Sequence, residues 1–377
     1  MNSRKIRLFT WYRGANYGSS LQAYALLHKL ALLGYKVKVI REFNYPYSLN
    51  SILNNIWLKL GFSVSIFRGL KIKRIRALKD YPYPVARKRF LSFFRKEIPS
   101  VLPAGPLSLG CMKRNTRVFV TGSDQLWNCY DHFRGLEFLD FVHGVKKVSY
   151  ATSIGAGSIP EQYQDQVRSY LSEYSHISVR EKSAELELKR ITGRSDIRTV
   201  LDPTFLLSAE EWRSLAGGAS NDLQMPGRYI FCYLLRKDFD YSETLARIKE
   251  QTGIQEAVLF PSNENPGLQI EGCRRCGNAG PKEFVKALDG AAFVLTDSFH
   301  GSALSIILGK QFANLKRFSD NDVKSQNSRL YNLMDMLGMQ PRFVEDGFPQ
   351  AIDYAVVQAK LAALREDSVS YLKEIVE

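Results

Sequence analysis

The sequence predicts an α/β protein with two doubly wound, Rossmann-like domains that face each other across a cleft. Short apolar stretches alternate with helical patterns along both halves of the chain, which is typical of parallel sheets joined by right-handed crossovers. The 377 residues are 45% hydrophobic and 24% charged, which suits two domains with large cores. Ligands in such folds bind beyond the carboxyl ends of the strands, so polar residues there are site candidates.

The N-terminal half begins with a predicted strand at 5–12 and a helix at 19–34 that ends at Gly34. The later strands of this half are predicted at 35–42, 117–123, 147–157, 176–181 and 197–203, with a helix at 182–193. Pro203 ends the last strand, and Ser208 with Glu211 has the pattern of a capping box that opens a new helix. We therefore place the N-terminal domain at 1–205.

The C-terminal half repeats the same alternation. Its predicted strands are 228–235, 256–260, 293–298 and 311–316, and its predicted helices are 281–291, 301–310 and 329–339. We expect a second Rossmann-like domain at 206–345. The remaining residues, 346–377, are expected to form C-terminal helices that pack back on the first domain.

Residues 66–96 interrupt this alternation with a basic insertion. The segment has eleven Lys and Arg against one Asp, so it supplies +10 of the formal net charge of +14. Apolar and aromatic residues are interleaved with these charges. The pattern suits either a helix on an anionic membrane surface or a solvated helix with one core-facing stripe. The positive charge favours anionic partners, but no nucleic-acid-binding motif is present and we expect no nucleic acid.

Composition also bears on compartment and metal content. No apolar run approaches the roughly 18 residues that span a bilayer, and the first residues lack the apolar core of a signal peptide. Five cysteines, an odd number, favour a reduced compartment. We therefore expect the cytoplasm, with contact at the inner face of the membrane if 66–96 binds lipid. Cys273 and Cys276 are a lone pair, whereas structural zinc needs four ligands, so no metal is expected.

Chemistry-bearing residues follow two predicted strands in particular. Asp297, Ser298 and His300 lie between an apolar strand and an apolar helix, where free N–H groups are available to a ligand. His300 either handles protons in a site or satisfies a turn. Arg180 ends another strand beside Glu181. Its guanidinium suits bidentate recognition of a carboxylate or phosphate, or an ion pair within its own domain.

Two loops of the N-terminal half add further candidates. The loop before the first helix contains Asn16, Gly18 and Ser19, whose backbone N–H groups could contact a ligand at the helix start. The strand at 117–123 is followed by Asp124, and then by Trp127 and Asn128. Trp127 and Asn128 could contact a sugar face and its hydroxyls, while the alternative makes Trp127 a core anchor.

Taken together, these stretches resemble the polysaccharide pyruvyl transferase family. The carrying segments are NYGSSLQAYAL, TGSDQLWN, SYATSIGA, SVREKSA, VLDPTFLL and DSFHGSALSIILGK, in that order from about residue 10 to 340. The resemblance implies a fold similar to glycosyltransferase type B. It also implies an enzyme that moves the pyruvyl group of phosphoenolpyruvate onto two hydroxyls of a bacterial glycan sugar, as in an exopolysaccharide or capsule. A pyruvate ketal forms, phosphate leaves, and no cofactor is needed besides this donor substrate.

The resemblance also suggests roles for individual residues. His300 is expected to handle the proton or, as imidazolium, to hold the phosphate. Asp297 is expected to orient its imidazole, and Arg180 to clamp the carboxylate or phosphate of the donor. The other donor-side candidates are Ser298, Gly301, Ser302, Lys316, Arg317 and Arg329. The acceptor-side candidates are Asn16, Tyr17, Gly18, Ser19, Asp124, Trp127 and Asn128. Many family members have an acidic residue where this chain has Ser19, which leaves the acceptor open.

The expected partners are phosphoenolpyruvate and a sugar acceptor, and the basic insertion would suit an acceptor carried on a membrane lipid. Two alternatives remain at this point. One is a nucleotide-sugar-dependent glycosyltransferase of the type B fold. The other is a non-catalytic glycan-assembly protein on a retained fold.

Overall fold

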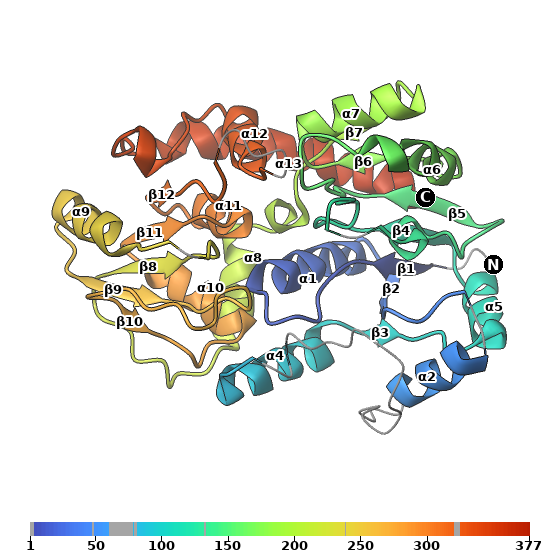
Figure 1. The fold of residues 1–377 in the computed structure, drawn as a ribbon, viewed down its shortest axis with the longest axis horizontal. Helices are drawn as coiled ribbons and strands as arrows, with labels where there is room; N and C mark the ends of the chain where they lie inside the picture. Colours follow the sequence, from blue (N-terminus) through green and yellow to red (C-terminus); the bar gives the residue numbers. More distant parts are fainter. Residues whose placement is uncertain are drawn as a thin grey trace.

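The computed structural model describes residues 4–46, 49–59, 78, 81–131, 133–237, 239–319 and 325–377. Two five-stranded sheets, each with only parallel pairings, form two α/β domains (Figure 1). The order of the first sheet is β3 (Ser100–Val101), β2 (Lys36–Ile40), β1 (Lys5–Phe9), β4 (Val118–Thr121) and β5 (Lys146–Ser149). A two-stranded sheet of β6 (Ser178–Val179) and β7 (Arg198–Thr199) continues beside β5 through a bridge between Val148 and His176.

The second sheet repeats this topology. Its order is β10 (Arg274–Arg275), β9 (Glu256–Leu259), β8 (Tyr229–Tyr233), β11 (Phe293–Thr296) and β12 (Phe312–Asn314). In both sheets the first strand of the domain lies at the centre and later strands extend to both edges, which is the doubly wound arrangement. The central strands β4, β8 and β11 are buried along their whole length, as expected for a parallel sheet covered on both faces. The predicted fold class, two Rossmann-like domains as in glycosyltransferase type B, is confirmed.

Helices cover both faces of each sheet (Figure 1). Those of the N-terminal half are α1 (Tyr17–Leu32), α2 (Leu49–Lys59), α4 (Pro84–Glu97), α5 (Pro106–Arg114), α6 (Glu161–Ser172) and α7 (Lys182–Thr192), with the 3-10 turns η1 (Gly135–Phe138) and η2 (Pro203–Leu206). Those of the C-terminal half are α8 (Ala209–Gly217), α9 (Ser242–Thr252), α10 (Pro281–Gly290), α11 (Phe299–Ile307), α12 (Ser328–Leu337), η3 (Val344–Asp346) and α13 (Tyr354–Val376). Ser208 and Glu211 form the predicted capping box at the start of α8. Among the described residues, no helix is long and apolar enough to cross a bilayer.

The largest core cluster extends across both domains. Tyr17, at the start of α1, stacks on Phe284 of α10 with ring centroids 4.3 Å apart, and its hydroxyl donates to the carbonyl of Ala279. The C-terminal helix α13 contacts the N-terminal half, since Ser368 Oγ accepts from the backbone N–H of Leu201 at 3.0 Å. Because apolar packing is continuous from one domain to the other, the boundaries at 205 and 345 stay predictions.

Part of the basic insertion has a structural role. Residues 66–77, 79 and 80 lie outside the described residues. The later part of the segment, from residue 84, forms most of α4. Phe90, Phe93 and Phe94 of α4 are buried, and Phe90 lies 5.1 Å from the ring of Tyr17. Arg89 donates to both carboxylate oxygens of Asp222 at 2.5 and 2.7 Å. These phenylalanines therefore form a core-facing stripe, while contact of the insertion with a membrane stays a prediction.

Candidate functional site

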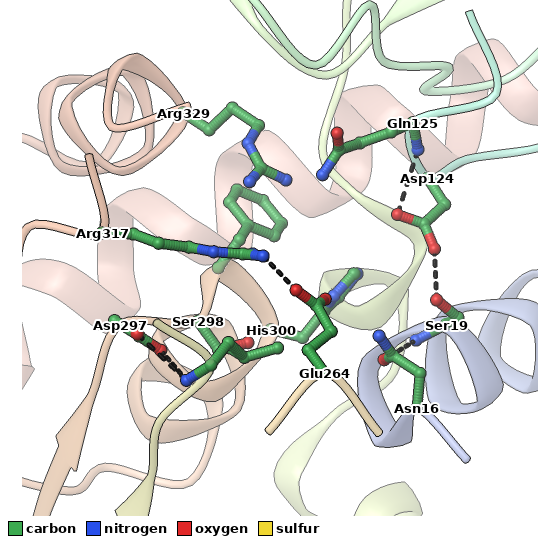
Figure 2. A pocket seen from close by; sticks show the side chains of 12 residues that line it. Asn16, Ser19, Asp124, Gln125, Glu264, Asp297, Ser298, His300, Arg317 and Arg329 are labelled. Atoms are coloured by element: carbon green, nitrogen blue, oxygen red, sulfur yellow. Dashed lines mark hydrogen bonds and ion pairs between the residues drawn. The ribbon is translucent and has the colours of Figure 1, made fainter. Parts of the chain in front are cut away.

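A pocket of about 380 Å³, counting its open mouth, lies between the carboxyl ends of the two sheets (Figure 2). Both domains supply its lining, which is Asn16, Ser19, Asp124, Gln125, Leu235, Glu264, Asp297, Ser298, Phe299, His300, Arg317 and Arg329. Its position is the one that the topology favours, because helix N-termini and strand ends from both sheets converge there. Eight of the predicted site residues line this pocket: Asn16, Ser19, Asp124, Asp297, Ser298, His300, Arg317 and Arg329.

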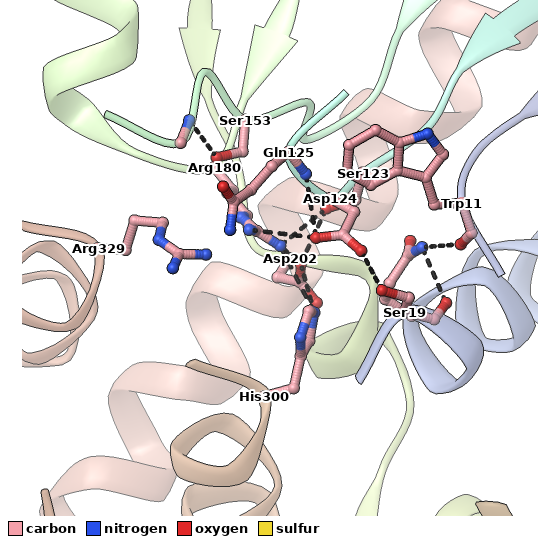
Figure 3. Close-up of polar contacts among 12 residues, drawn as sticks. Trp11, Ser19, Ser123, Asp124, Gln125, Ser153, Arg180, Asp202, His300 and Arg329 are labelled. Atoms are coloured by element: carbon pink, nitrogen blue, oxygen red, sulfur yellow. Dashed lines mark hydrogen bonds and ion pairs between the residues drawn. The ribbon is translucent and has the colours of Figure 1, made fainter. Parts of the chain in front are cut away.

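His300 occupies the first turn of α11 and reaches toward the N-terminal domain. Ser298 caps this helix, its Oγ accepting from the backbone N–H of Gly301 at 3.3 Å. The imidazole is buried, and its Nε2 lies 3.7 Å from Asp202 Oδ2 and 3.5 Å from Arg180 Nη1. His300 of the C-terminal domain is thus held against a carboxylate and a guanidinium of the N-terminal domain (Figure 3).

Gly18 allows α1 to approach the imidazole this closely. A Cβ built on Gly18 would clash with the Nδ1, Cγ and Cβ atoms of His300. Any side chain at this position would push the ring away from its place between the domains. Gly18 therefore belongs to the site through steric fit, rather than through the backbone N–H contact that we expected.

Arg180 is the centre of a buried ionic cluster and does not line the pocket (Figure 3). Its guanidinium donates to Asp202 at 2.8 Å and to Glu181 at 2.9 Å, and it lies 3.9 Å from Asp124. The ring of Phe299 lies 4.5 Å from the guanidinium carbon. Three carboxylates surround this buried cation, so the structure places Arg180 behind the pocket, and its role as a donor clamp stays a prediction. Arg180 holds Asp202, and it lies close to Asp124 in the pocket wall.

Asp202 is the carboxylate that faces His300. It also accepts from Thr204 N at 2.9 Å, Thr204 Oγ1 at 2.7 Å and Ser123 Oγ at 2.9 Å. Burial by itself would raise the pKa of Asp202, but the facing His300 and the charge of Arg180 outweigh burial and hold it well below its usual range. Asp202 therefore stays ionised and presents a negative charge to the imidazole. We did not single it out, although it lies in the VLDPTFLL stretch.

Asp297 has a different partner from the one we predicted. Its carboxylate accepts from the backbone N–H of Leu235 at 2.8 Å and of Arg236 at 2.7 Å, so it ties the loop after β8 to the end of β11. No hydrogen bond or ion pair joins it to His300 within the described chain. Burial raises the pKa of Asp297 to about 6 despite these N–H donors. The carboxylate that faces the His300 imidazole is Asp202, at 3.7 Å.

Asp124 lines the N-terminal side of the pocket in a strained backbone conformation. Its φ is +75°, in the left-handed region, which costs a non-glycine residue on the order of 1–3 kcal/mol. The side chain accepts from Ser19 Oγ at 2.5 Å and from the backbone N–H of Gln125 at 3.0 Å. The Asn16 side chain in turn accepts from Ser19 N at 3.0 Å, so the N-terminus of α1 presents Asn16, Ser19 and Asp124 together (Figure 2).

The opposite wall is cationic. Arg317 pairs with Glu264, and both line the pocket. Arg329 is buried, and its guanidinium donates to the backbone oxygen of Gln326 at 3.3 Å and to the side-chain oxygen at 2.5 Å. No ion pair between Arg329 and a carboxylate is found among the described residues. Burial, followed by the charge of Arg180, lowers the pKa of Arg329 to about 9. An anion entering this pocket would relieve that excess positive charge.

The remaining predicted site residues lie in structural positions. Tyr17 is fully buried in the interdomain core, and Trp127 stacks on Phe138 with centroids 5.4 Å apart. Asn128 binds the side chains of Gln125 and Asp131. These three do not line the pocket, and Trp127 is buried as the core-anchor alternative expects, so direct acceptor contact by the three stays a prediction without support from their positions.

Three donor-side candidates also lie behind the pocket wall. Gly301 packs closely on the side chain of Thr296. Ser302 Oγ donates to the carbonyl of Ser298 at 3.1 Å and accepts from Asn314. Lys316 lies 3.3 Å from Asp346. Gly301 and Ser302 thus support the loop before α11, while Lys316 takes part in a peripheral ion pair.

Cys273 and Cys276 are free thiols, as are the other three cysteines. In the described parts of the chain, no three His, Cys, Asp or Glu side chains gather as a metal site would require.

Comparison with known proteins gives one sequence match and several structural likenesses. The model of a family described as polysaccharide pyruvyl transferase matches residues 16–317. No curated protein matches the chain. Among solved structures, the UDP-GlcNAc 2-epimerase of Methanocaldococcus jannaschii in complex with UDP-GlcNAc and UDP is similar at 13% identity and TM-score 0.45, covering 96% of this chain and 99% of that one.

Two further solved structures are similar over nearly the whole chain. A glycosyltransferase from Rickettsia africae has 11% identity and TM-score 0.46, with 100% of both chains covered. UGT89C1 of Arabidopsis thaliana, complexed with UDP-L-rhamnose, has 13% identity and TM-score 0.45, covering 98% of this chain and 93% of that one. The assignment of the fold rests on the two parallel sheets described above.

Proposed function

The chain belongs to the polysaccharide pyruvyl transferase family, and from this premise we propose that it transfers a pyruvyl group from phosphoenolpyruvate to two hydroxyls of a glycan sugar. The observation that carries the proposal is Arg329. It is a buried guanidinium on the pocket wall without a carboxylate partner among the described residues. A buried cation of this kind is stabilised by an anionic ligand. Phosphoenolpyruvate carries both a phosphate and a carboxylate.

The donor would bind to the cationic wall. Arg329 takes one anionic group of the donor, and Arg317 takes the other after its pair with Glu264 opens. The charge-assisted bonds of each guanidinium contribute roughly 1.5–3 kcal/mol. The N-terminus of α11 lies beside this wall, and its free N–H groups favour the same negative charge.

His300 supplies the proton. As an imidazolium beside Asp202, it protonates the methylene carbon, so that the neighbouring carbon develops oxocarbenium character. The first sugar hydroxyl attacks that carbon and gives its proton to Asp124. Phosphate then leaves with the electron pair of the C–O bond and takes up the proton held by Asp124. The second hydroxyl closes the ketal and gives its proton to the neutral His300, which restores the imidazolium. Atoms and charge balance without a redox partner or a cofactor.

A ligand-binding experiment tests the donor. We expect phosphoenolpyruvate at about 100 times its dissociation constant to stabilise the wild type by roughly 2.7 kcal/mol in thermal unfolding. Arg329→Gln should lose most of this shift. Lys316→Gln is the matched control, because Lys316 pairs with Asp346 outside the pocket and should keep the shift. A shift with nucleotide sugars but none with phosphoenolpyruvate would make the protein a glycosyltransferase and overturn the proposal.

His300→Gln separates binding from chemistry. Removing a preorganised group that stabilises charge typically costs about 2.7–4 kcal/mol of barrier, or roughly 100- to 1,000-fold in rate. We expect phosphate release from phosphoenolpyruvate with an acceptor to fall by that factor, while the donor-induced thermal shift remains. Near-normal turnover in His300→Gln would remove this residue from the mechanism.

A further inference from the structure

Exposed apolar side chains are concentrated on one part of the molecule. Among the described residues, eleven large hydrophobic side chains are exposed, and seven of them lie between residues 45 and 107. These seven are Tyr45, Leu49, Leu53, Ile56, Val85, Leu91 and Leu107. The same stretch of chain contains the basic insertion. Most of the exposed large apolar side chains therefore lie in the part of the sequence that also supplies most of the net positive charge.

α2 presents an apolar stripe to solvent. Leu49, Leu53 and Ile56 are exposed by 75%, 47% and 41% and follow one another at spacings of four and three residues. Residues at these spacings share one face of a helix. The opposite side faces the protein, since Asn55 is fully buried and Ile52 packs beside Gly105. A regular apolar row on the outer face of a helix is a feature of interaction surfaces.

α4 presents a mixed basic and apolar face. Its inner face carries the buried phenylalanines, whereas Val85 and Leu91 are each exposed by 42% on the outside. Lys88, Arg95 and Lys96 are exposed as well, and none of them forms an ion pair within the described chain. Helices that lie in a lipid headgroup region typically have such a face, on which Lys and Arg lie beside exposed apolar side chains.

The two helices belong to the same edge of the N-terminal sheet. α2 and α4 both precede the edge strand β3 in the chain, and α5, which carries Leu107 with 88% exposure, follows it. In Figure 1, α2 and α4 lie along the lower side of the N-terminal domain, and α5 lies to the right of β2 and β3. We name these three helices, which precede and follow the edge strand β3 in the chain, together the β3-edge surface.

We propose that the β3-edge surface docks onto an anionic membrane. Charge decides between the possible occupants. A second copy of this chain would bring one set of unpaired cations against another. An anionic lipid surface attracts each cation and also accepts the apolar side chains below its headgroups. The docking concerns a surface away from the pocket and does not depend on which group the enzyme transfers.

Vesicle flotation of the full chain tests the docking. We expect wild type to float with phosphatidylcholine vesicles that contain phosphatidylglycerol, and to remain unbound with phosphatidylcholine alone. Lys88→Gln/Arg95→Gln/Lys96→Gln should weaken the partitioning roughly 100-fold, at about fivefold per cation. Leu49→Ser/Leu53→Ser/Ile56→Ser should weaken it at least tenfold. Raising the salt concentration should also release the protein, because it screens the headgroup charge.

A matched variant controls for surface hydrophobicity in general. Leu186→Ser/Val356→Ser removes two side chains exposed by 58% and 64% on α7 and α13, outside the β3-edge surface, and should float like wild type. All three variants should keep the thermal midpoint of wild type, since every changed side chain is exposed. Wild type that stays unbound with anionic vesicles would overturn the proposal, and so would an α2 variant that floats as well as wild type. Loss of a dimer in the α2 variant without any vesicle binding would assign the surface to self-association instead.

Discussion

Two buried arginines lie near the pocket, Arg329 in its wall and Arg180 behind it, and their surroundings are opposite. Arg180, on the N-terminal side, lies among Asp202, Glu181 and Asp124, which together raise its pKa above the ordinary value against the effect of burial. Arg329, on the C-terminal side, has only amide and carbonyl partners in the described chain, and burial lowers its pKa to about 9. One cation is already neutralised by the protein, and the other can be neutralised by a ligand.

This difference separates structural support from binding. A guanidinium with its charge balanced internally holds the carboxylates that shape the site, and removing it leaves those carboxylates buried without a counter-ion. A guanidinium without such carboxylate partners destabilises the ligand-free protein, and it is stabilised when an anion binds beside it. Residue type alone predicts neither role, because both residues are buried arginines near the same pocket.

The largest effect expected is on the stability of the Arg180 cluster. Arg180→Met should lower the free energy of unfolding by about 3–5 kcal/mol, because it breaks buried ion pairs from one side. Arg329→Gln should leave it unchanged or raise it. Urea unfolding at pH 7 measures both, with Arg190→Met as the surface control, since the pair of Arg190 with Glu187 is largely exposed on the arginine side. Equal losses of unfolding free energy in Arg180→Met and Arg329→Gln would contradict the proposed difference between the two arginines.

A smaller effect is expected where the two walls meet at Gly18. Gly18→Ala forces the imidazole of His300 to move, and overpacking of this kind costs about 1–3 kcal/mol. A displacement of about 1 Å can also cost roughly 100-fold in rate. The turnover of Gly18→Ala should therefore fall further than its loss of folding stability alone would cause. Gly110→Ala is the control, because a Cβ there meets no atom within 4 Å and the α5 helix should gain up to about 1 kcal/mol. If Gly18→Ala keeps full turnover, the interdomain position of His300 is not needed for chemistry.

The smallest effect concerns the pH dependence contributed by Asp297. Its pKa is raised to about 6 in the folded protein from 3.8, so the folded state binds a proton that the unfolded chain releases between these values. Stability from this group is therefore greater at pH 5 than at pH 7, by about 1 kcal/mol. The difference between wild type and Asp297→Asn in urea unfolding should show that change. A difference that is the same at both pH values would place the pKa of Asp297 near its ordinary value.

Much of the fold follows from local sequence patterns. The buried strands β4, β8 and β11 lie within the apolar stretches that predict them, and the Ser208–Glu211 capping box forms as expected. The alternation of such strands with helices also predicts the doubly wound sheets. In contrast, the strand predicted at 147–157 ends at Ser149, and beyond it only Thr152 keeps single bridges, to Asp124 and Val179. The strands β3 and β10 have two residues each, which is too short for an alternating or apolar pattern to predict them from sequence.

The candidate site is less predictable because its residues come from distant parts of the chain. Sequence places His300, Ser298, Asp297 and Arg180 at strand ends, and for this reason they lie near the pocket. It does not indicate that Asp202, 98 positions before His300, is the carboxylate that faces the imidazole. It also does not distinguish Trp127 in a core from Trp127 on a sugar, since an indole suits both environments.

The sequence by itself determined the fold class, the family and the strand ends where polar residues gather, because periodicity and turn chemistry act over a few residues. Only the tertiary structure decided which arginine is neutralised and which is available to a ligand. That depends on the carboxylates that the fold brings within about 4 Å, where charges in a buried environment interact strongly. Arg180 received three such neighbours and Arg329 none among the described residues, and this difference in packing defines the site.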